Sequence, residues 1–440
     1  MILDSATESA PRSELERWQL KKLQETLENV YVNVPFYHEA MNAAKVKPSD
    51  IASLEDLTRL PFTRKSNLRD NYPFGLIAVP LEQVVRFHAS SGTRGKPTVV
   101  AYTQGDIDRW ARIVARAVAC AGGRPGDRFH NAYGYGLFTG GLGLHYGIEA
   151  LGAAVIPVSG GNTPRQVRLI EDFRPRGISG TPSYVLNIAD EMVKMGINPR
   201  DTSLEYGILG AEPWSEALRV EIEESLAIKA MDIYGLSEVI GPGVAIECIE
   251  AQNGLHIAED HFLTEVVDPN TGEPLPYGET GELVFTSLTK EAFPVVRYRT
   301  GDIASLDPEP CVCGRTLMRM SRIKGRLDDM LIIRGVNVFP TEIEYVLLQI
   351  SEIAPHYQVV VGQAGALDTL EVHCEVTPGY FAAVGSLDAD HAKSNALRNR
   401  VLHMLRSELG ISVGLHIHKP GVLPRSEGKA VRIVDKRSQV

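Results

Sequence analysis

The chain has 440 residues, enough for two or three domains of roughly 150 residues each, and 44% of them are hydrophobic. Its 45 Lys and Arg are outnumbered by 55 Asp and Glu, and the net charge of −10 without any long basic block argues against a nucleic-acid-binding protein. The N-terminal residues lack the basic and apolar regions of a secretory signal, and the weakly polar stretch 138–161 is interrupted by polar residues, so we expect a cytoplasmic protein without a membrane span.

The first half of the chain has the pattern of an α/β layer. Ser13 and Glu16 form a capping-box pattern that predicts the start of a helix, whose apolar face is Leu15, Trp18, Leu23, Leu27 and Val30. Between about residues 80 and 240, β-rich runs such as 98–103 and 153–161 alternate with helical patterns such as 106–122. This alternation predicts parallel strands covered by helices.

The second half changes character twice. After Gly241, hairpin patterns at 254–260, 264–275 and 281–289 predict an antiparallel β subdomain. Further on, Thr341 and Glu344 form a second capping-box pattern, 370–376 alternates as a strand, and a helix ending at Gly410 is striped by Leu397, Val401, Met404, Leu405 and Leu409.

We therefore predict an α/β fold with two domains. Residues 1–327 form a large, multi-layer N-terminal body that includes the β subdomain, and residues 328–440 form a small, mobile α+β domain. The boundary falls in the polar stretch 326–329, which has no enrichment in Pro or Ser.

Residues 88–98 combine hydroxyls, glycines and cations directly after an apolar strand pattern. Such a loop can wrap backbone N–H groups and hydroxyls around phosphate oxygens, while Arg94 or Lys96 offsets the negative charge. It is not a Walker loop, because only Gly-x-x-Gly-Lys-Pro is present and Pro97 would interrupt a phosphate-capping helix. Taken alone, the segment also fits a flexible surface loop.

Two further segments place carboxylates near predicted strand ends. Ser237 and Glu238 follow the strand pattern that begins at Asp232, and Glu238 suits a hard cation such as Mg²⁺. Asp302 follows Gly301 in a predicted tight turn, where its carboxylate could accept two hydrogen bonds from a ribose diol. A helix cap or surface charge is the alternative for the first segment, and an ordinary turn is the alternative for the second.

Seven segments in this order resemble the adenylate-forming superfamily of acyl-CoA synthetases, and most closely its phenylacetate-CoA ligase branch. They span nearly the whole chain and lie at 90–98, 132–147, 210–214, 234–238, 298–302, 322–340 and 424–432. One departure is Arg94, which stands where the family usually has a second threonine. The resemblance implies an enzyme that uses ATP, Mg²⁺ and coenzyme A to convert a carboxylic acid into an acyl adenylate and then into a CoA thioester.

The resemblance also implies roles for individual residues. The loop that holds the β- and γ-phosphates of ATP would consist of Ser90, Ser91, Gly92, Thr93, Gly95 and Lys96. The adenine would lie along Gly210, Ala211, Glu212 and Pro213, with Tyr234 stacked on the base and Gly235 beside it. Ser237 would lie near the α-phosphate and Glu238 at Mg²⁺, while Asp302, assisted by Arg326, would bind the ribose. Asp328 matches the hinge of the mobile domain, and Lys429 matches its catalytic lysine.

The acid pocket is expected in the Gly- and aromatic-rich segment 133–141, with Tyr135, Phe138 and Ile240 as candidate lining residues. Phenylacetate is the acid that the resemblance implies. Benzoate, anthranilate or indoleacetate would require only small changes in pocket depth, because one methylene contributes only about 1–3 kcal/mol of discrimination.

A metal site separate from this chemistry is also predicted. Five cysteines in so long an intracellular chain do not form a disulfide framework. Adjacent β elements could gather Cys248, His256, Cys311 and Cys313, which would suit a closed tetrahedral Zn²⁺ site, with His261 as the reserve ligand. Buried free thiols are the alternative for these cysteines, while Cys120 and Cys374 are interpreted as core residues.

Two other functions remain open at this point. One is an adenylating enzyme that transfers its product to an acceptor other than CoA, and the other is a nucleotide-binding regulatory protein without turnover. Glu238, Asp302 and Lys429 argue against the second, since a binding module needs no catalytic lysine. The related ligases suggest a homodimer.

Overall fold

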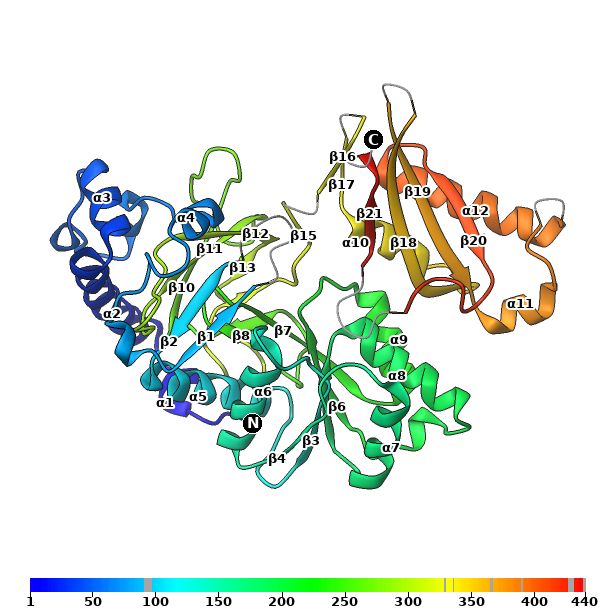
Figure 1. Ribbon diagram of the computed structural model, residues 1–440, viewed down its shortest axis with the longest axis horizontal. Helices are drawn as coiled ribbons and strands as arrows, with labels where there is room; N and C mark the ends of the chain where they lie inside the picture. The colour runs from blue at the N-terminus through cyan, green and yellow to red at the C-terminus, as the bar shows by residue number, and fades with distance from the viewer. Residues whose placement is uncertain are drawn as a thin grey trace. The chain divides into compact units, whose positions relative to one another are not determined.

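The computed structural model describes residues 1–90, 97–327, 330–334, 336–364, 367–388, 391–425 and 431–437. The chain divides into two compact units. The first unit comprises Met1–Gly180, Asp201–Ala211 and Ile228–Ile323, and the second comprises Thr181–Arg200, Glu212–Ala227 and Lys324–Val440. Figure 1 shows their helices and strands coloured along the chain.

A nine-stranded sheet forms the centre of the first unit, in the order β13-β14-β9-β8-β7-β6-β5-β3-β4. Its strands are β3 (Arg128–Asn131), β4 (Ala154–Pro157), β5 (Gly177–Gly180), β6 (Tyr206–Gly210), β7 (Lys229–Leu236), β8 (Gly241–Glu247), β9 (Leu255–Ile257), β13 (Leu306–Asp307) and β14 (Arg319–Met320). All pairings from β4 to β7 are parallel, and all pairings from β7 to β13 are antiparallel. The expected parallel layer is therefore present, and it changes to antiparallel pairing at β7 and β8.

Helices α5 (Gln104–Cys120) and α6 (Thr139–Leu151) pack against β8 and against each other. Thr103 caps α5 by accepting a hydrogen bond from the Asp106 amide, which satisfies one of the free N–H groups of the first turn. The apolar face of α5 is buried and includes Trp110, Val114 and Val118. Cys120 at the end of α5 is buried, as predicted.

Two smaller antiparallel sheets complete the strands of the first unit. β1 (Arg86–Ala89) pairs with β2 (Val99–Tyr102), so the run 98–103 is not part of the parallel layer and that expectation is wrong. β10 (Phe262–Val267), β11 (Gly281–Ser287) and β12 (Tyr298–Ala304) form the predicted antiparallel subdomain. The remaining helices of four or more residues are α1 (Ser5–Glu8), α2 (Arg12–Asn33), α3 (Pro35–Ala43), α4 (Lys65–Asp70) and α7 (Thr163–Phe173).

The helix predicted to start at Ser13 begins one residue earlier, at Arg12, with Pro11 in the capping position and no side-chain cap. The expected capping box of Ser13 and Glu16 is therefore wrong. Ser13 is the second residue of the helix, so its side chain is not in the capping position. Trp18 is 43% exposed rather than part of the buried face, and its indole N–H donates to the Asp260 carbonyl.

The second unit has a separate hydrophobic core around a four-stranded sheet of order β20-β19-β18-β21. Its elements are α8 (Pro182–Lys194), α9 (Glu216–Leu226), β15 (Gly325–Arg326), β16 (Leu331–Ile333), β17 (Val336–Val338), α10 (Pro340–Leu348), β18 (Ile353–Ala364), β19 (Leu367–Val376), α11 (Pro378–Val384), α12 (Ala392–Leu409), β20 (Gly414–His418) and β21 (Ile433–Asp435). Cys374 is buried in β19, and Gly410 ends α12 in a left-handed conformation, both as predicted.

The capping box expected from Thr341 and Glu344 is also wrong. Pro340 is the first residue of α10, and Glu342 accepts the hydrogen bond from the Phe339 amide. Glu344 is buried and instead accepts a hydrogen bond from the amide of Ser215, at 2.9 Å.

Across the part of the chain that the structure describes, no helix combines the length and the apolar composition that crossing a bilayer would demand.

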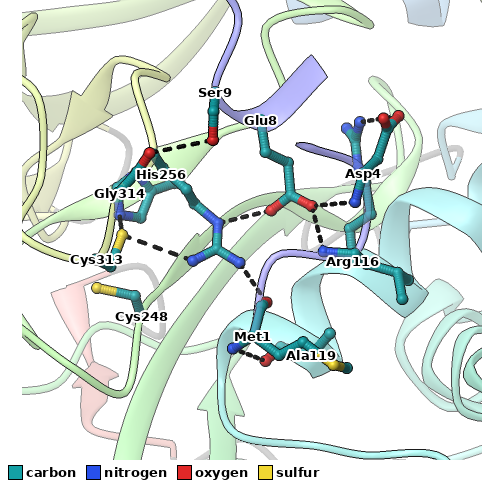
Figure 2. Close-up of polar contacts among 12 residues, drawn as sticks. Met1, Asp4, Glu8, Ser9, Arg116, Ala119, Cys248, His256, Cys313 and Gly314 are labelled. Carbon is teal, nitrogen blue, oxygen red and sulfur yellow. Dashed lines mark hydrogen bonds and ion pairs between the residues drawn. The ribbon is translucent and has the colours of Figure 1, made fainter. Parts of the chain in front are cut away.

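The first residues of the chain are held to the first unit by one buried ion pair. Figure 2 shows the Glu8 carboxylate at the centre of these contacts. One of its oxygens accepts hydrogen bonds from the amides of Leu3 and Asp4, and the other lies 2.6 Å from Nε of Arg315. Arg315 also donates to the Met1 carbonyl at 2.7 Å, and both charged side chains are almost fully buried. Glu8 and Arg315 are 307 residues apart in the sequence, so their ion pair connects the N-terminal segment to a distant part of the chain.

Replacing Glu8 with Ala should destabilise the protein by about 3–5 kcal/mol, because the Arg315 guanidinium would remain buried without its counter-charge. The measurement is the free energy of unfolding in denaturant, with the exposed Glu14→Ala variant as the control. If both variants unfold at the same denaturant concentration, the ion pair does not hold the N-terminal segment in place.

Candidate functional site

The turn between β7 and β8 lies where the sheet changes from parallel to antiparallel pairing. Ser237 and Glu238 occupy this turn and are both buried. The reversal depends on glycine, because a Cβ on Gly235 would lie 1.9 Å from the carbonyl oxygen of Gly241. The carboxyl end of a strand at such a switch point is where α/β sheets bind ligands.

Two hydrogen bonds fix this turn against neighbouring elements. The hydroxyls of Ser237 and Thr139, the first residue of α6, are 3.1 Å apart. The Tyr102 hydroxyl on β2 donates to the Ile240 carbonyl at 2.8 Å. The turn therefore connects the Gly-rich segment before α6 with the strand that follows the predicted phosphate loop.

Tyr234, predicted to stack on the adenine, and Asp302, predicted to bind the ribose, are in contact with each other. The Tyr234 hydroxyl donates to a carboxylate oxygen of Asp302 at 2.7 Å, and both side chains are buried. The sequence predicted that Asp302 follows a tight turn, and this is wrong. Asp302 lies inside β12, beside a bulge at which Gly301 has a φ of 77°. Gly301 tolerates this left-handed conformation, and its amide donates to Glu282 on β11.

The segment 210–213 leaves the end of β6. A Cβ on Gly210 would lie 2.2 Å from the Ile233 carbonyl oxygen, so only glycine fits beside β7. Ala211 has a φ of 68°, an uncommon conformation for a residue with a side chain. Gly210 and Ala211 belong to the first unit, whereas Glu212, Pro213 and Arg326 belong to the second.

Several predicted site residues lie outside the described residues: Ser91, Gly92, Thr93, Gly95 and Lys96 of the phosphate loop, the hinge residue Asp328, and Lys429. The start of the phosphate loop is described, since the Ser90 amide donates to the Thr98 carbonyl at 3.0 Å.

The three candidate pocket residues differ in their surroundings. Tyr135 and Phe138 are partly buried, whereas Ile240 is 3% exposed and belongs to the main core. The Tyr135 hydroxyl accepts a hydrogen bond from the Asn131 amide group at 2.8 Å and lies 3.2 Å from Nδ1 of His145. Burial raises the pKa of Tyr135 to about 12, so this phenol is neutral at pH 7.

The sequence interpretation missed Lys290. Its side chain is buried, its ammonium lies 4.5 Å from the Tyr102 ring centroid, and its Nζ has no hydrogen-bond partner among the described residues. Burial lowers the pKa of Lys290 to about 8, against the attraction of Asp106 and Glu238. Asp106 fixes the backbone beside this lysine by accepting hydrogen bonds from the amides of residues 291 and 292. A single Lys in a loop gives no sequence signal, because it is normally solvated.

The four predicted metal ligands come together in the first unit. Cys248 follows β8, His256 lies in β9, and Cys311 and Cys313 precede β14, which pairs with β9. Their ligand atoms all lie within 4.8 Å of one another. The sulfur atoms of Cys248 and Cys311 are 3.8 Å apart, and Cys313 Sγ lies 3.4 Å from His256 Nε2. A tetrahedral Zn²⁺ with its usual bond lengths requires separations of about 3.8 and 3.5 Å, so the donor set fits this ion.

The surroundings favour a thiolate at Cys313, whereas the hydrogen bond to Cys313 and burial raise the pKa of Cys248. Hydrogen bonds from Cys248, His256 and Arg315 hold the pKa of Cys313 well below its ordinary value. Arg315, which pairs with Glu8, donates to Cys313 Sγ at 3.6 Å, so the cluster and the N-terminal segment share one cation. Figure 2 shows Cys248, His256 and Cys313 near Glu8. The reserve ligand His261 is not part of this group, because its ring nitrogens contact Thr289 and Asp260.

The AMP-binding enzyme family model matches residues 12–289, and the model of the AMP-binding enzyme C-terminal domain matches residues 335–437. The phenylacetate-coenzyme A ligase of Thermus thermophilus is 54% identical over 99% of this chain and 100% of its own length. The enzyme of the same name from Escherichia coli is 53% identical over 98% of this chain and 97% of its own length.

A solved structure of a 2-hydroxyisobutyryl-CoA ligase superposes with a TM-score of 0.92 at 28% identity, covering 99% of this chain and 92% of that one. The family models cover the turn at Ser237 and the C-terminal sheet, and the relatives also cover the strand at Asp302. The chain therefore belongs to the AMP-binding enzyme family and, within it, to the phenylacetate-coenzyme A ligase branch.

Proposed function

We propose that this chain is an ATP-dependent ligase that joins phenylacetate to coenzyme A through an acyl adenylate. The observation that carries the proposal is the identity of 53–54% with phenylacetate-coenzyme A ligases over 98–99% of the chain. The buried turn that carries Ser237 and Glu238 supports it, together with the hydrogen bond between Tyr234 on β7 and Asp302 on β12.

Adenylation solves a leaving-group problem. A carboxylate is a poor acyl donor, so its oxygen first attacks the α-phosphate of ATP, pyrophosphate leaves, and AMP becomes the leaving group for the thiol of CoA. Bound Mg²⁺, held by Glu238, would neutralise charge on the phosphates. Ser237 would donate a hydrogen bond to the α-phosphate, while Asp302, held by Tyr234 and assisted by Arg326, would accept from the ribose hydroxyls.

The two half-reactions make different demands on the small domain. Lys429 would neutralise charge at the α-phosphate during adenylation, but the same carbonyl must then be open to a thiol. We propose that Asp328 is the hinge of the rearrangement between the steps and that the domain boundary lies at 327/328. Hinge residues absorb large backbone changes between the two states of an enzyme.

Phenylacetate should give the highest kcat/KM when the full-length protein is incubated with Mg²⁺, ATP, CoA and separate aromatic acids. Benzoate lacks one methylene and should be used about 10–200-fold less efficiently, the usual range for one methylene in an apolar pocket. The products to measure by mass spectrometry are AMP and the acyl-CoA thioester, with Glu238→Gln as the inactive control.

Each alternative product pattern points to a different function. Thioester formed preferentially from another aryl acid would keep the mechanism and revise the pocket assigned to Tyr135, Phe138 and Ile240. AMP without thioester would indicate an acceptor other than CoA. No turnover of any acid would contradict the ligase proposal.

We also propose that Lys290 contacts an anionic group of the substrates. Its buried ammonium is near Glu238 but makes no hydrogen bond among the described residues. A charge held in this way costs stability, because the pKa falls from 10.5 to about 8, which corresponds to about 3 kcal/mol. A phosphate or carboxylate would supply the missing partner. In the complex the ammonium would then be stabilised where negative charge develops.

Lys290→Met should slow adenylation by about 10²–10³-fold while raising the free energy of unfolding at pH 7. The stability gain should be complete below about pH 8 and disappear as the pH rises through 10.5, because the folded lysine releases its proton first. The measurements are pyrophosphate release and denaturant unfolding at several pH values. Lys194→Met, on the exposed side of α8, is the matched control. Full activity in Lys290→Met would remove the lysine from the site.

The cluster of Cys248, His256, Cys311 and Cys313 is proposed to hold a structural Zn²⁺. With three thiolates and one imidazole the site has no position for a substrate, so the ion would tie the strands β8, β9 and β14 together. Its proximity to Arg315 would connect metal binding to the docking of the N-terminal segment.

The purified full-length protein should contain about one zinc per chain, and Cys311→Ser should lose it. A chelator should lower the melting temperature of the natural protein more than that of the variant, because an ion that binds only the folded state stabilises it. Cys374→Ala, which removes a buried thiol from the second unit, is the control. Equal zinc content in the Cys311→Ser variant would refute the site. A homodimer and a cytoplasmic location also stay predictions.

A further inference from the structure

A second group of possible metal ligands lies on the sheet of the second unit, away from the residues discussed so far. Glu371, His373 and His416 offer ligand atoms that all lie within 4.8 Å of one another. Glu371 and His373 are on β19, and His416 is on the parallel neighbour β20.

The sheet register explains why these side chains meet. Residues 371 and 373 point to the same face of β19, opposite to the buried Leu370, Val372 and Cys374 of the core. His373 is directly opposite His416 in the register, and their rings stack with centroids 4.4 Å apart. The cross-strand pair therefore brings two imidazoles beside the Glu371 carboxylate.

The distances are close to those of a coordination sphere. One oxygen of Glu371 lies 3.6 Å from His373 Nε2 and 3.5 Å from His416 Nε2. Donor atoms of a tetrahedral Zn²⁺ with two imidazoles and one carboxylate are about 3.3–3.4 Å apart. The two rings are nearly parallel, at an interplanar angle of 14°, so one ring must rotate for both Nε2 lone pairs to point at one ion.

His418 supplies the outer partner that a metal-binding histidine needs. Its Nε2 lies 3.1 Å from Nδ1 of His373. If Nδ1 of His373 donates to His418, the lone pair of His373 is on Nε2, which faces Glu371. This Nε2 atom is buried and has no hydrogen-bond partner among the described residues. The contact of Nδ1 with His418 thus orients the His373 ring, and no hydrogen-bond donor among the described residues occupies the lone pair of Nε2.

We propose that Glu371, His373 and His416 bind a divalent transition-metal ion, with Zn²⁺ as the ion that fits the donor set, and that His418 orients His373. Two imidazoles and one carboxylate are an established set for Zn²⁺, and hard ions such as Mg²⁺ favour all-oxygen sites. His416 is half exposed, so an ion can enter from solvent.

The ion would connect β20 to β19 on the sheet face that also contacts residues 421–425. Glu375, on this face of β19, accepts hydrogen bonds from the amides of Gly421 and Leu423 and forms a bidentate ion pair with Arg425. Glu375 is opposite His418 in the register. Metal binding would thus stiffen the pair of strands β19 and β20, to which Glu375 binds residues 421–425.

The test is titration of ZnCl₂ into the full-length, untagged protein by calorimetry. We expect one binding event in addition to the zinc that the purified protein already holds at the Cys248 cluster, and this event should be weakened at least about 100-fold in His373→Gln and His416→Gln. His418→Gln should weaken it about 10–100-fold, the usual cost of losing an outer-shell partner. His403→Gln, which removes an exposed histidine of α12, should bind as the natural protein does.

The outcomes are distinct from those of the ligase proposal, since the readout is metal binding and not turnover. Because His416 is exposed, its variant tests the site even if a variant of His373 folds poorly. Unchanged zinc binding in the His416 variant would overturn the proposal. Binding that is lost entirely in Cys311→Ser, with no second event, would overturn it as well.

Discussion

The close approach of two backbones at Gly235 and Gly241 is the constraint on which the candidate site depends. A side chain at residue 235 would collide with the Gly241 carbonyl oxygen at 1.9 Å, so only glycine lets β7 reverse direction within four residues. This reversal converts a parallel sheet into an antiparallel one and leaves Ser237 and Glu238 at the point of change. The pairing of β8 with β9 then brings Cys248, which directly follows β8, close to His256 on β9.

Buried charges in the first unit are of two kinds, and the difference separates structure from function. Glu8 and Arg315 satisfy each other with direct hydrogen bonds, which is typical of a buried ion pair that fixes one arrangement of the chain. Lys290 is equally buried but has only carboxylates at longer range and aromatic rings around it. An ionisable group that lowers stability and is positioned by Asp106 is more consistent with ligand binding than with folding.

The order of the sequence motifs predicted the family and the residues around the turn, because these motifs are local and their glycines have local steric reasons. The Cys and His cluster was also predictable, since pairing neighbouring hairpins brings residues 248, 256, 311 and 313 together. Helix starts were less predictable: Pro11 and Pro340 fixed the backbone at α2 and α10, and the Ser and Thr capping patterns gave way to them.

Contacts between segments far apart in the sequence could not be predicted, and the reason is physical. Asp302 was expected in a turn because Thr-Gly-Asp has turn chemistry, but Glu282 on the neighbouring strand binds the Gly301 amide and keeps the glycine in a bulge. Lys290 and Glu371 give no sequence signal, because a single charged residue is normally solvated. Distant segments bury Lys290, and the strand register places two histidines beside Glu371. Such interactions depend on which strands become neighbours, which no single segment encodes.

The two groups of metal ligands differ in a way that predicts different roles for them. The thiolate-rich cluster is buried, contains four donors and shares Arg315 with the N-terminal segment, so it has the properties of a permanent structural site. The group on β19 and β20 has three donors and is partly exposed, so an ion there would exchange with solvent. Because Glu375 on the same face holds residues 421–425, an exchangeable ion would act on the sheet that supports this segment.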